Sequence, residues 1–180
     1  LIAHADGMKW SKMISNLLSN AASAILNMTP TEIYRDADLY ALERRQILET
    51  VRVMEANNIP VVDIPGVPVR LLVWVFRAFP SGVARKILTK AIGGGRGSKM
   101  PSFHIDLYSG SRENEVEFLN GAIVRFGKAK KIPTPVNALY YDTLMALTMR
   151  QLPIAEFDHQ PAKFMEYFVE KITTACPPSA

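Results

Sequence analysis

The first part of the chain has a helical pattern of apolar and polar positions. Between Met8 and Leu26, apolar residues recur every three or four positions, and Asp6 is placed to cap the first turn. They are Met13, Ile14, Leu17, Leu18, Ala21, Ala24 and Ile25. On the other side, Lys12, Asn16 and Asn20 follow at four-residue steps, which keeps them in one shallow stripe. The pattern predicts one continuous helix over residues 8–26, with its apolar arc in the core.

Further along the chain the pattern again predicts helices. Thr29 to Glu32 has the form of a capping box, with Pro30 at the first helical position. Periodic apolar positions indicate helices over residues 38–56, 69–79, 83–92, 112–131, 137–149 and 161–174. No segment alternates like a strand and no repeat is visible, so the sequence predicts an all-α fold.

Three of these segments carry more specific expectations. The charged residues of segment 38–56 are expected to form a solvated face; they are Glu43, Arg44, Arg45, Glu49 and Arg52. Segment 69–79 is almost continuously hydrophobic, which predicts burial. Ser111 can cap segment 112–131, and Asn120-Gly121 is kept within that helix because no alternating strands flank it.

Two stretches between the predicted helices read as connectors. Residues 59–68 carry three prolines and a glycine, which rules out helix. Residues 93–98 are rich in glycine, but no strand precedes them and no Gly-Lys-Ser/Thr ending follows, so a phosphate loop is excluded. We therefore expect a single helical domain over residues 1–180, with a flexible loop inside it at residues 93–99.

Composition limits the classes of partner and compartment. The 180 residues carry a net charge of +4, which permits an anionic partner, but the basic residues lack the interleaved aromatics of a nucleic-acid surface. Cys176 is the only cysteine, so no internal disulfide can form and a reducing, cytoplasmic setting is expected. The longest apolar run, Val67 to Phe79, is too short to span a membrane. Because the chain begins at Leu1 and enters a helix at once, we expect it to be a piece of a longer protein.

Two interpretations of the Lys12 stripe are open on periodicity alone. The stripe can be the wet face of an amphipathic helix, although such faces are normally built from long charged residues rather than Asn and Ser. It can also bind a ligand. Lysine brings a cation with three donors, and each carboxamide of Asn16 and Asn20 brings donors and an acceptor, a set suited to a small carboxylate or hydroxy acid. His4, His104 and His159 lack the spacing of a metal site or a triad, so each is expected to be a surface residue or a structural one with its hydrogen bonds satisfied.

Two stretches with defined spacing resemble a known family. The first places Trp10, Lys12, Asn16 and Asn20 in the order Trp-x-Lys-x-x-x-Asn-x-x-x-Asn. The second begins with Ser102 and Asp106 in Ser-x-x-x-Asp, continues with Glu-x-x-x-x-Asn-Gly from Glu115 to Gly121, and ends in Pro-Thr-Pro-x-Asn at Asn137. Together they resemble the C-terminal domain of the ketopantoate reductase (2-dehydropantoate 2-reductase) family. Between residues 27 and 98 the agreement lies only in the order of helices.

The resemblance implies a fold and an activity. The fold is an all-α domain of the 6-phosphogluconate dehydrogenase C-terminal type, docked on an N-terminal Rossmann domain that is absent from this chain and binds most of the NADPH. The activity is reduction of ketopantoate to pantoate in pantothenate and coenzyme A biosynthesis, with the fragment inactive alone and a homodimer possible. No Gly-x-Gly-x-x-Gly turn occurs in these residues, in keeping with a missing cofactor domain.

The resemblance also implies residue roles. Lys12 matches the general acid that protonates the keto oxygen, and Asn16, Asn20 and Ser102 match residues that hold the substrate. Glu115 matches a catalytic acid near the nicotinamide, although an acid in a first helical turn is also favoured by the helix dipole alone. The chain departs from the family pattern at one position. Some family members have a further substrate-binding Asn beyond the first helix, and residues 27–30 contain no secure counterpart of it. A reductase of another 2-oxo acid, or a basic helical interaction module without enzymatic activity, are therefore the alternatives.

Overall fold

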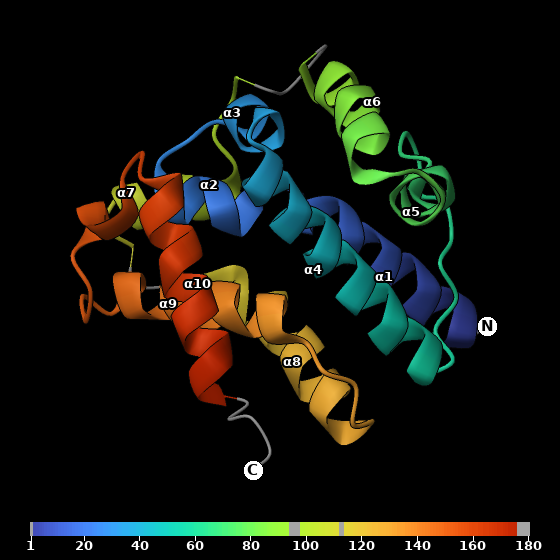
Figure 1. The fold of residues 1–180 in the computed structure, drawn as a ribbon. Helices are drawn as coiled ribbons and strands as arrows, with labels where there is room; N and C mark the ends of the chain where they lie inside the picture. Colours follow the sequence, from blue (N-terminus) through green and yellow to red (C-terminus); the bar gives the residue numbers. More distant parts are fainter. Residues whose placement is uncertain (1, 94–97, 112–113, 176–180) are drawn as a thin grey trace.

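The computed structural model describes residues 2–93, 98–111 and 114–175, and every regular element in these ranges is a helix (Figure 1). The α-helices are α1 (Ile2–Leu17), α2 (Asn20–Leu26), α3 (Pro30–Arg35), α4 (Ala37–Ala56), α5 (Val69–Ala78), α6 (Ser81–Gly93), α7 (Ser102–Tyr108), α8 (Asn120–Ala129), α9 (Pro135–Thr148) and α10 (Pro161–Ala175). Two short 3-10 helices, η1 (Glu115–Glu117) and η2 (Ile154–Phe157), complete the set. The predicted all-α fold is confirmed.

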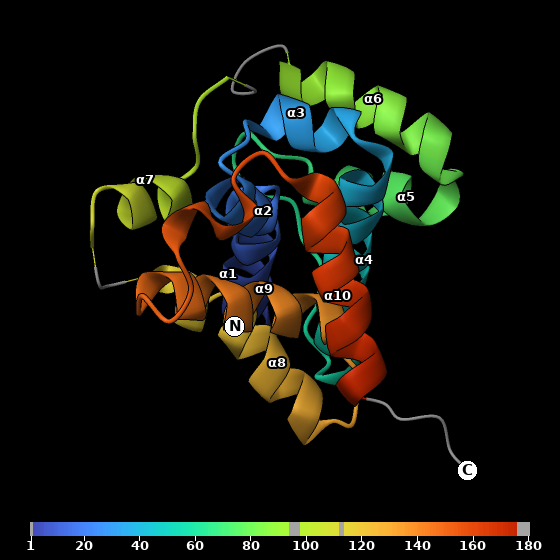
Figure 2. The ribbon, with the colours of Figure 1, turned by 60° about the vertical axis from the view of Figure 1, so that its left-hand side comes forward.

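Helix α4 organises the domain. It packs against α1, α3, α5, α6, α8, α9 and α10. Figures 1 and 2 show α5 and α6 on one side of α4, with α8, α9 and α10 on another side. Its residues Ile47, Val51 and Val53 are fully buried, and the Tyr40 ring stacks on Phe76 of α5 with centroids 6.3 Å apart. The core therefore lies along both sides of α4.

Local signals placed several helix ends correctly. The capping box at α3 forms as predicted: the Glu32 amide donates to Thr29 Oγ1 at 3.3 Å, and the Thr29 amide donates to Glu32 Oε2 at 2.7 Å. Helices α4, α9 and α10 each begin and end within two residues of the predicted limits. The predicted flexible loop at residues 93–99 falls mainly on residues 94–97, outside the described ranges.

The prediction of one continuous helix over residues 8–26 is wrong. Helix α1 begins earlier, at Ile2, and ends at Leu17, and Ser19 takes a left-handed conformation with φ of 54° before α2 begins. The Ser19 amide donates to Glu43 Oε2 of α4 at 2.6 Å, a contact that no local pattern reveals. Lys12 and Asn16 therefore lie on α1, whereas Asn20 lies on a separate helix.

The predicted solvated face of α4 is also partly wrong. Arg45 and Arg52 are exposed, but the side chains of Glu43 and Glu49 are buried, with exposed fractions of 0% and 1%. Each carboxylate accepts hydrogen bonds from backbone amides of another element, which offsets the cost of burying its charge. Arg44 is half-buried, because its guanidinium donates to the Phe76 carbonyl at 2.8 Å.

Two further helices differ from the expectation. Helix α5 buries only one face: Val73 and Phe76 are buried, while Leu71 and Trp74 are each 55% exposed, because α5 lies at the edge of the domain. The predicted helix over residues 112–131 is divided into η1 and α8, and residues 112–113 lie outside the described ranges. Asn120 is the first residue of α8, so Asn120-Gly121 is helical as expected.

Gly127 marks a close approach between the end of α8 and the segment that leads into α9. A Cβ there would lie 2.9 Å from the Ile132 carbonyl oxygen and 2.9 Å from Thr134 Cγ2. Gly127→Ala is therefore expected to lower the free energy of unfolding by about 1–3 kcal/mol, measured by urea denaturation. Gly82→Ala in α6 is the control, because nothing lies within 4 Å of its added Cβ. A neutral Gly127→Ala would contradict this packing.

Candidate active site

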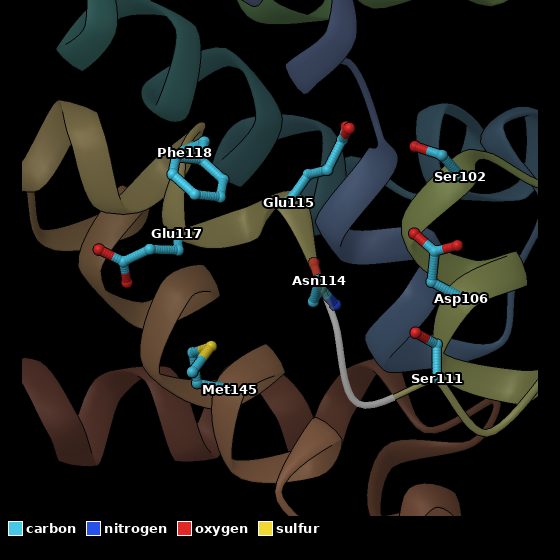
Figure 3. Close-up of a pocket in the computed structure, with 8 residues that line it drawn as sticks. All are labelled: Ser102, Asp106, Ser111, Asn114, Glu115, Glu117, Phe118 and Met145. Atoms are coloured by element: carbon cyan, nitrogen blue, oxygen red, sulfur yellow. The ribbon is translucent and has the colours of Figure 1, made fainter.

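A pocket of about 670 Å³ lies between α7, η1 and α9 (Figure 3). Its lining residues are Ser102, Asp106, Ser111, Asn114, Glu115, Glu117, Phe118 and Met145. Figure 3 shows the side-chain oxygens of Ser102, Asp106 and Ser111 directed from the α7 side toward the space that separates them from η1. The pocket therefore has the Ser102, Asp106 and Ser111 oxygens on the α7 side. The other side carries the Glu115 and Glu117 carboxylates together with the apolar side chains of Phe118 and Met145.

Ser102 is held in place by Asn20 from α2. The Asn20 side-chain oxygen accepts from the Phe103 amide at 3.0 Å, and its nitrogen donates to Ser102 Oγ at 3.3 Å. Asn20 is only 5% exposed, whereas Ser102 is exposed at the pocket. The structure thus brings together two of the predicted substrate-binding residues, with Asn20 behind Ser102.

A second contact fixes α7 on the end of α2. His104 Nε2 lies 2.8 Å from Asn27 Oδ1, and the His104 ring stacks on Tyr108 with centroids 4.3 Å apart. Asn27 in turn donates to Asp158 Oδ1 at 3.2 Å. Burial lowers the pKa of His104, which favours a neutral ring at physiological pH. This histidine anchors the helix that carries Ser102 and Asp106.

Glu115 begins η1 and is exposed at the pocket. Asn114 shapes this turn, because its side-chain oxygen accepts from the Val116 amide at 2.8 Å while its nitrogen donates to Thr148 Oγ1 of α9 at 3.3 Å. The Glu115 carboxylate has no hydrogen bond or ion pair within the described ranges, so it is available to a ligand or to another charged group.

Glu117 lines the same pocket but is already engaged. Its carboxylate accepts hydrogen bonds from Arg125 of α8 and from the hydroxyl of Tyr141 of α9. The bond to Glu117 raises the pKa of Tyr141. Glu117 therefore ties η1 to its neighbours and leaves Glu115 as the free acid of this turn. Phe118 beside it is 73% exposed, an unusual exposure for a phenylalanine.

Lys12 and Asn16 are not among the residues that line the pocket. Both are exposed on α1, and in the described part of the chain the Lys12 ammonium has no ion-pair partner. Two residues earlier, the Trp10 ring packs edge-on against Phe126 of α8 with centroids 5.1 Å apart. This contact holds α1 against α8, and the Lys12 ammonium stays exposed on α1.

Sequence reasoning missed Asp106. It was named in the Ser-x-x-x-Asp spacing without a functional role, yet it lines the pocket and its carboxylate faces the pocket space. The signal was present, since Asp106 lies four residues after Ser102 and so shares its face of α7. Glu43 and Glu49 gave no such signal, because their roles depend on amides far away in sequence.

Among the residues that the structure describes, no group of three or more His, Cys, Asp or Glu side chains is placed to hold a metal ion. No helix in the described ranges combines the length and apolar composition that a membrane crossing requires. A dinucleotide phosphate cradle on a strand is likewise missing from these ranges, which contain no strand.

Comparison with known proteins identifies similar chains. The sequence model described as "Ketopantoate reductase PanE/ApbA C terminal" matches residues 5–148. A PanE/ApbA family ketopantoate reductase from Ralstonia eutropha JMP134 is similar in structure, with a TM-score of 0.61 and 25% identity over 79% of this chain and 41% of that one. No curated protein sequence matches.

A ternary complex of D-mandelate dehydrogenase with NADH and anilino(oxo)acetate is also similar. Its TM-score is 0.59 at 19% identity, over 78% of this chain and 40% of that one, and this likeness shows the fold alone. The chain thus spans about two fifths of the length of both solved relatives.

Proposed function

Because this chain belongs to the ketopantoate reductase PanE/ApbA C-terminal domain family, we propose that it is the substrate-binding and proton-donating part of an NAD(P)H-dependent reductase of a 2-oxo acid. The finer proposal is that the 2-oxo acid is ketopantoate, which would be reduced to pantoate in pantothenate biosynthesis. The observation that supports it is the pocket in which Ser102, backed by Asn20, and the free acid Glu115 occur together.

The residues of this chain fit a cofactor that is held mainly elsewhere. The described ranges offer no phosphate cradle, but the exposed Glu115 carboxylate can accept hydrogen bonds from a ribose or carboxamide group at the pocket. When bound, a reduced nicotinamide supplies the hydride that is added to the keto carbon. We propose that an N-terminal Rossmann domain in the intact protein binds the rest of the cofactor and covers the open pocket.

The proposed roles follow from charge and hydrogen bonding. Addition of hydride to a ketone builds negative charge on the keto oxygen, so a nearby cation that can give up a proton lowers the barrier. Lys12 is that cation, and Asn16 lies one turn further on the same exposed side of α1. Ser102 donates to a carboxylate or hydroxyl oxygen of the substrate, while Asn20 orients Ser102. Glu115 accepts from the Lys12 ammonium or from the cofactor.

A second candidate is the reduction of a bulkier 2-oxo acid. It is supported by the two apolar side chains that line the pocket, Met145 and Phe118, the second of which is 73% exposed. A panel of ketopantoate, 2-oxoisovalerate and phenylglyoxylate, assayed on the intact protein with NADPH and NADH, separates the candidates by kcat/KM. If ketopantoate is not reduced while another member is, the finer proposal fails; if none is reduced, the general proposal fails.

Ser102→Ala tests the proposed substrate site. In the intact protein it is expected to raise the KM for the 2-oxo acid about tenfold, the usual effect of losing one hydrogen bond to a charged ligand, with the KM for the cofactor unchanged. Ser109→Ala is the matched control, because Ser109 lies at the other end of α7 and donates only to the Asp106 carbonyl. Equal KM values for both variants would remove Ser102 from the site.

A further inference from the structure

The turn between α1 and α2 takes a conformation that its sequence does not favour. Ser19 has φ of 54° and ψ of 3°, a left-handed conformation that costs free energy for a residue with a Cβ. Ser19 is 2% exposed, and within the described ranges its own side chain bonds only to the Leu18 carbonyl, at 2.7 Å. Something outside the turn must therefore stabilise it.

Glu43 of α4 supplies that contact. Its Oε2 accepts from the Ser19 amide at 2.6 Å, and its Oε1 accepts from the Tyr140 hydroxyl of α9 at 3.1 Å. The carboxyl is fully buried, and no cation pairs with it among the described residues. Burying a carboxylate without a cation costs free energy, and the hydrogen bonds from Ser19 and Tyr140 offset that cost. We therefore infer that the structural role of Glu43 is to stabilise the Ser19 turn.

The turn determines the direction of Asn20, the next residue. In one continuous helix Asn20 would share the stripe of Lys12 and Asn16, but the left-handed Ser19 directs it to α7 instead. There it bonds to the Phe103 amide at 3.0 Å and to Ser102 Oγ at 3.3 Å. A continuous chain of contacts therefore joins Glu43 to the pocket.

We propose that Glu43 is a positioning residue of the reductase site, which acts through the Ser19 turn and Asn20 to set the place of Ser102. The expected effect on the KM rests on the proposed function. The expected effect on the positions of Asn20 and Ser102 rests only on contacts within this chain. Glu43 itself lines no part of the pocket.

The test compares three variants of the intact protein. In Glu43→Gln the amide oxygen still accepts from Ser19 and the amide nitrogen can donate to Tyr140. Because a neutral acceptor is weaker than a carboxylate, the KM for the 2-oxo acid is expected to rise only about twofold, to the value that the wild type has when Glu43 is protonated. Glu43→Leu leaves the Ser19 amide without an acceptor and is expected to raise that KM about tenfold at a nearly unchanged kcat. Tyr140→Phe removes only the other bond and is the matched control, with KM unchanged.

A second readout needs no substrate. The Phe103 amide donates to Asn20 in a buried bond, so its hydrogen exchange reports the Asn20 contact directly. Exchange at Phe103 is expected to be about tenfold faster in Glu43→Leu than in Glu43→Gln. Equal exchange in folded protein overturns the inference whatever the activity. If no 2-oxo acid is reduced by the wild type, the proposed function fails, while this measurement still decides the role of Glu43.

A pH profile decides the case in which Glu43→Leu does not fold. Burial raises the pKa of Glu43 to about 7, and the titratable groups that face it are the hydroxyls of Tyr34 from α3 and Tyr140 from α9. Protonation below that pH weakens the acceptor of the Ser19 amide, so the KM of the wild type is expected to rise from pH 8 to pH 6. Glu43→Gln cannot titrate and is expected to lose this dependence. An identical pH dependence in the variant overturns the inference.

Discussion

Replacing Lys12 by alanine is expected to lower kcat for the 2-oxo acid by about 10²–10⁴-fold, the usual contribution of a positioned general acid. The physical reason is that the keto oxygen gains negative charge as hydride arrives, and alanine provides neither a cation nor a proton. Binding of NADPH to the variant, followed by nicotinamide fluorescence, is expected to be unchanged, because Lys12 lies on α1 and not on a phosphate-binding element.

Two further variants make this result specific. Lys9→Ala is the matched control, since Lys9 is an exposed lysine three residues earlier on the same helix. Lys12→Arg keeps the charge but cannot give up its proton near neutral pH, so it is expected to bind substrate and to turn over almost as slowly as Lys12→Ala. Near-normal turnover in Lys12→Ala would exclude Lys12 from the mechanism. Full activity of Lys12→Arg would show that Lys12 stabilises the negative charge on the keto oxygen but does not donate the proton.

Local patterns predicted the helices themselves better than the places where they break. The amphipathic period and the Thr29 capping box are local features, so the corresponding helices could be read directly. The break at Ser19 could not, because its cause is Glu43, which lies 24 residues away in sequence. Burial of Glu43 and Glu49 was missed for the same reason, since a charged residue in an amphipathic pattern is normally solvated.

The candidate site was predicted mainly from spaced motifs, because the periodic stripe of Lys12, Asn16 and Asn20 is equally compatible with a wet helix face. Asn20 and Ser102 were chosen by resemblance, and the structure shows a direct hydrogen bond between them. The roles of Lys12, Asn16, Asn20, Ser102 and Glu115 in catalysis and substrate binding stay predictions. Resemblance alone could not show that Asn20 is almost fully buried behind Ser102, because this depends on how α2 packs against α7.

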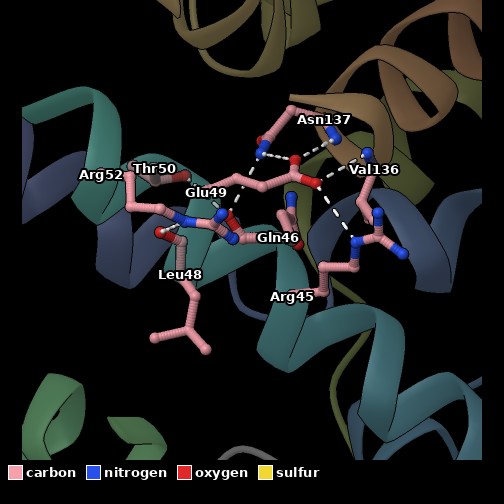
Figure 4. Close-up of polar contacts among 8 residues, drawn as sticks. All are labelled: Arg45, Gln46, Leu48, Glu49, Thr50, Arg52, Val136 and Asn137. Atoms are coloured by element: carbon pink, nitrogen blue, oxygen red, sulfur yellow. Dashed lines mark hydrogen bonds and ion pairs between the residues drawn. The ribbon is translucent and has the colours of Figure 1, made fainter. Parts of the chain in front are cut away.

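The motif residues Asn120 and Asn137 have a structural role that the sequence did not reveal. Asn120 Nδ2 donates to Asn137 Oδ1 at 3.1 Å, and Asn137 Nδ2 donates to Glu49 Oε2 at 2.9 Å and to the Gln46 carbonyl at 3.1 Å. Figure 4 shows the bonds from Asn137 to Glu49 and to Gln46, together with the bond from the Val136 amide to Glu49. Because α8 follows η1 directly, the network also fixes the segment that carries Glu115.

Glu49→Leu is expected to be the most destabilising of these substitutions, lowering the free energy of unfolding by about 3–5 kcal/mol. Glu49 caps the start of α9 from a different helix: its carboxylate accepts from the Val136 amide at 3.1 Å and from the Asn137 amide at 3.0 Å. Thr134, the residue at the cap position, makes no side-chain cap. Leucine would leave these buried donors unsatisfied and remove a negative charge from the positive end of the helix.

Urea denaturation measures this effect, with Glu49→Gln and Glu55→Gln as comparisons. Glu49→Gln keeps one acceptor oxygen and should lose less, while Glu55 forms an exposed pair with Arg77 and should change stability by under about 1 kcal/mol. Burial raises the pKa of Glu49 above 4.5, so the stability that this group contributes is complete below pH 4.5 and falls as the pH rises through the raised pKa. Glu49→Gln should therefore reduce the loss of stability over that range. Equal stability of Glu49→Leu and Glu55→Gln would show that α9 does not depend on this carboxylate.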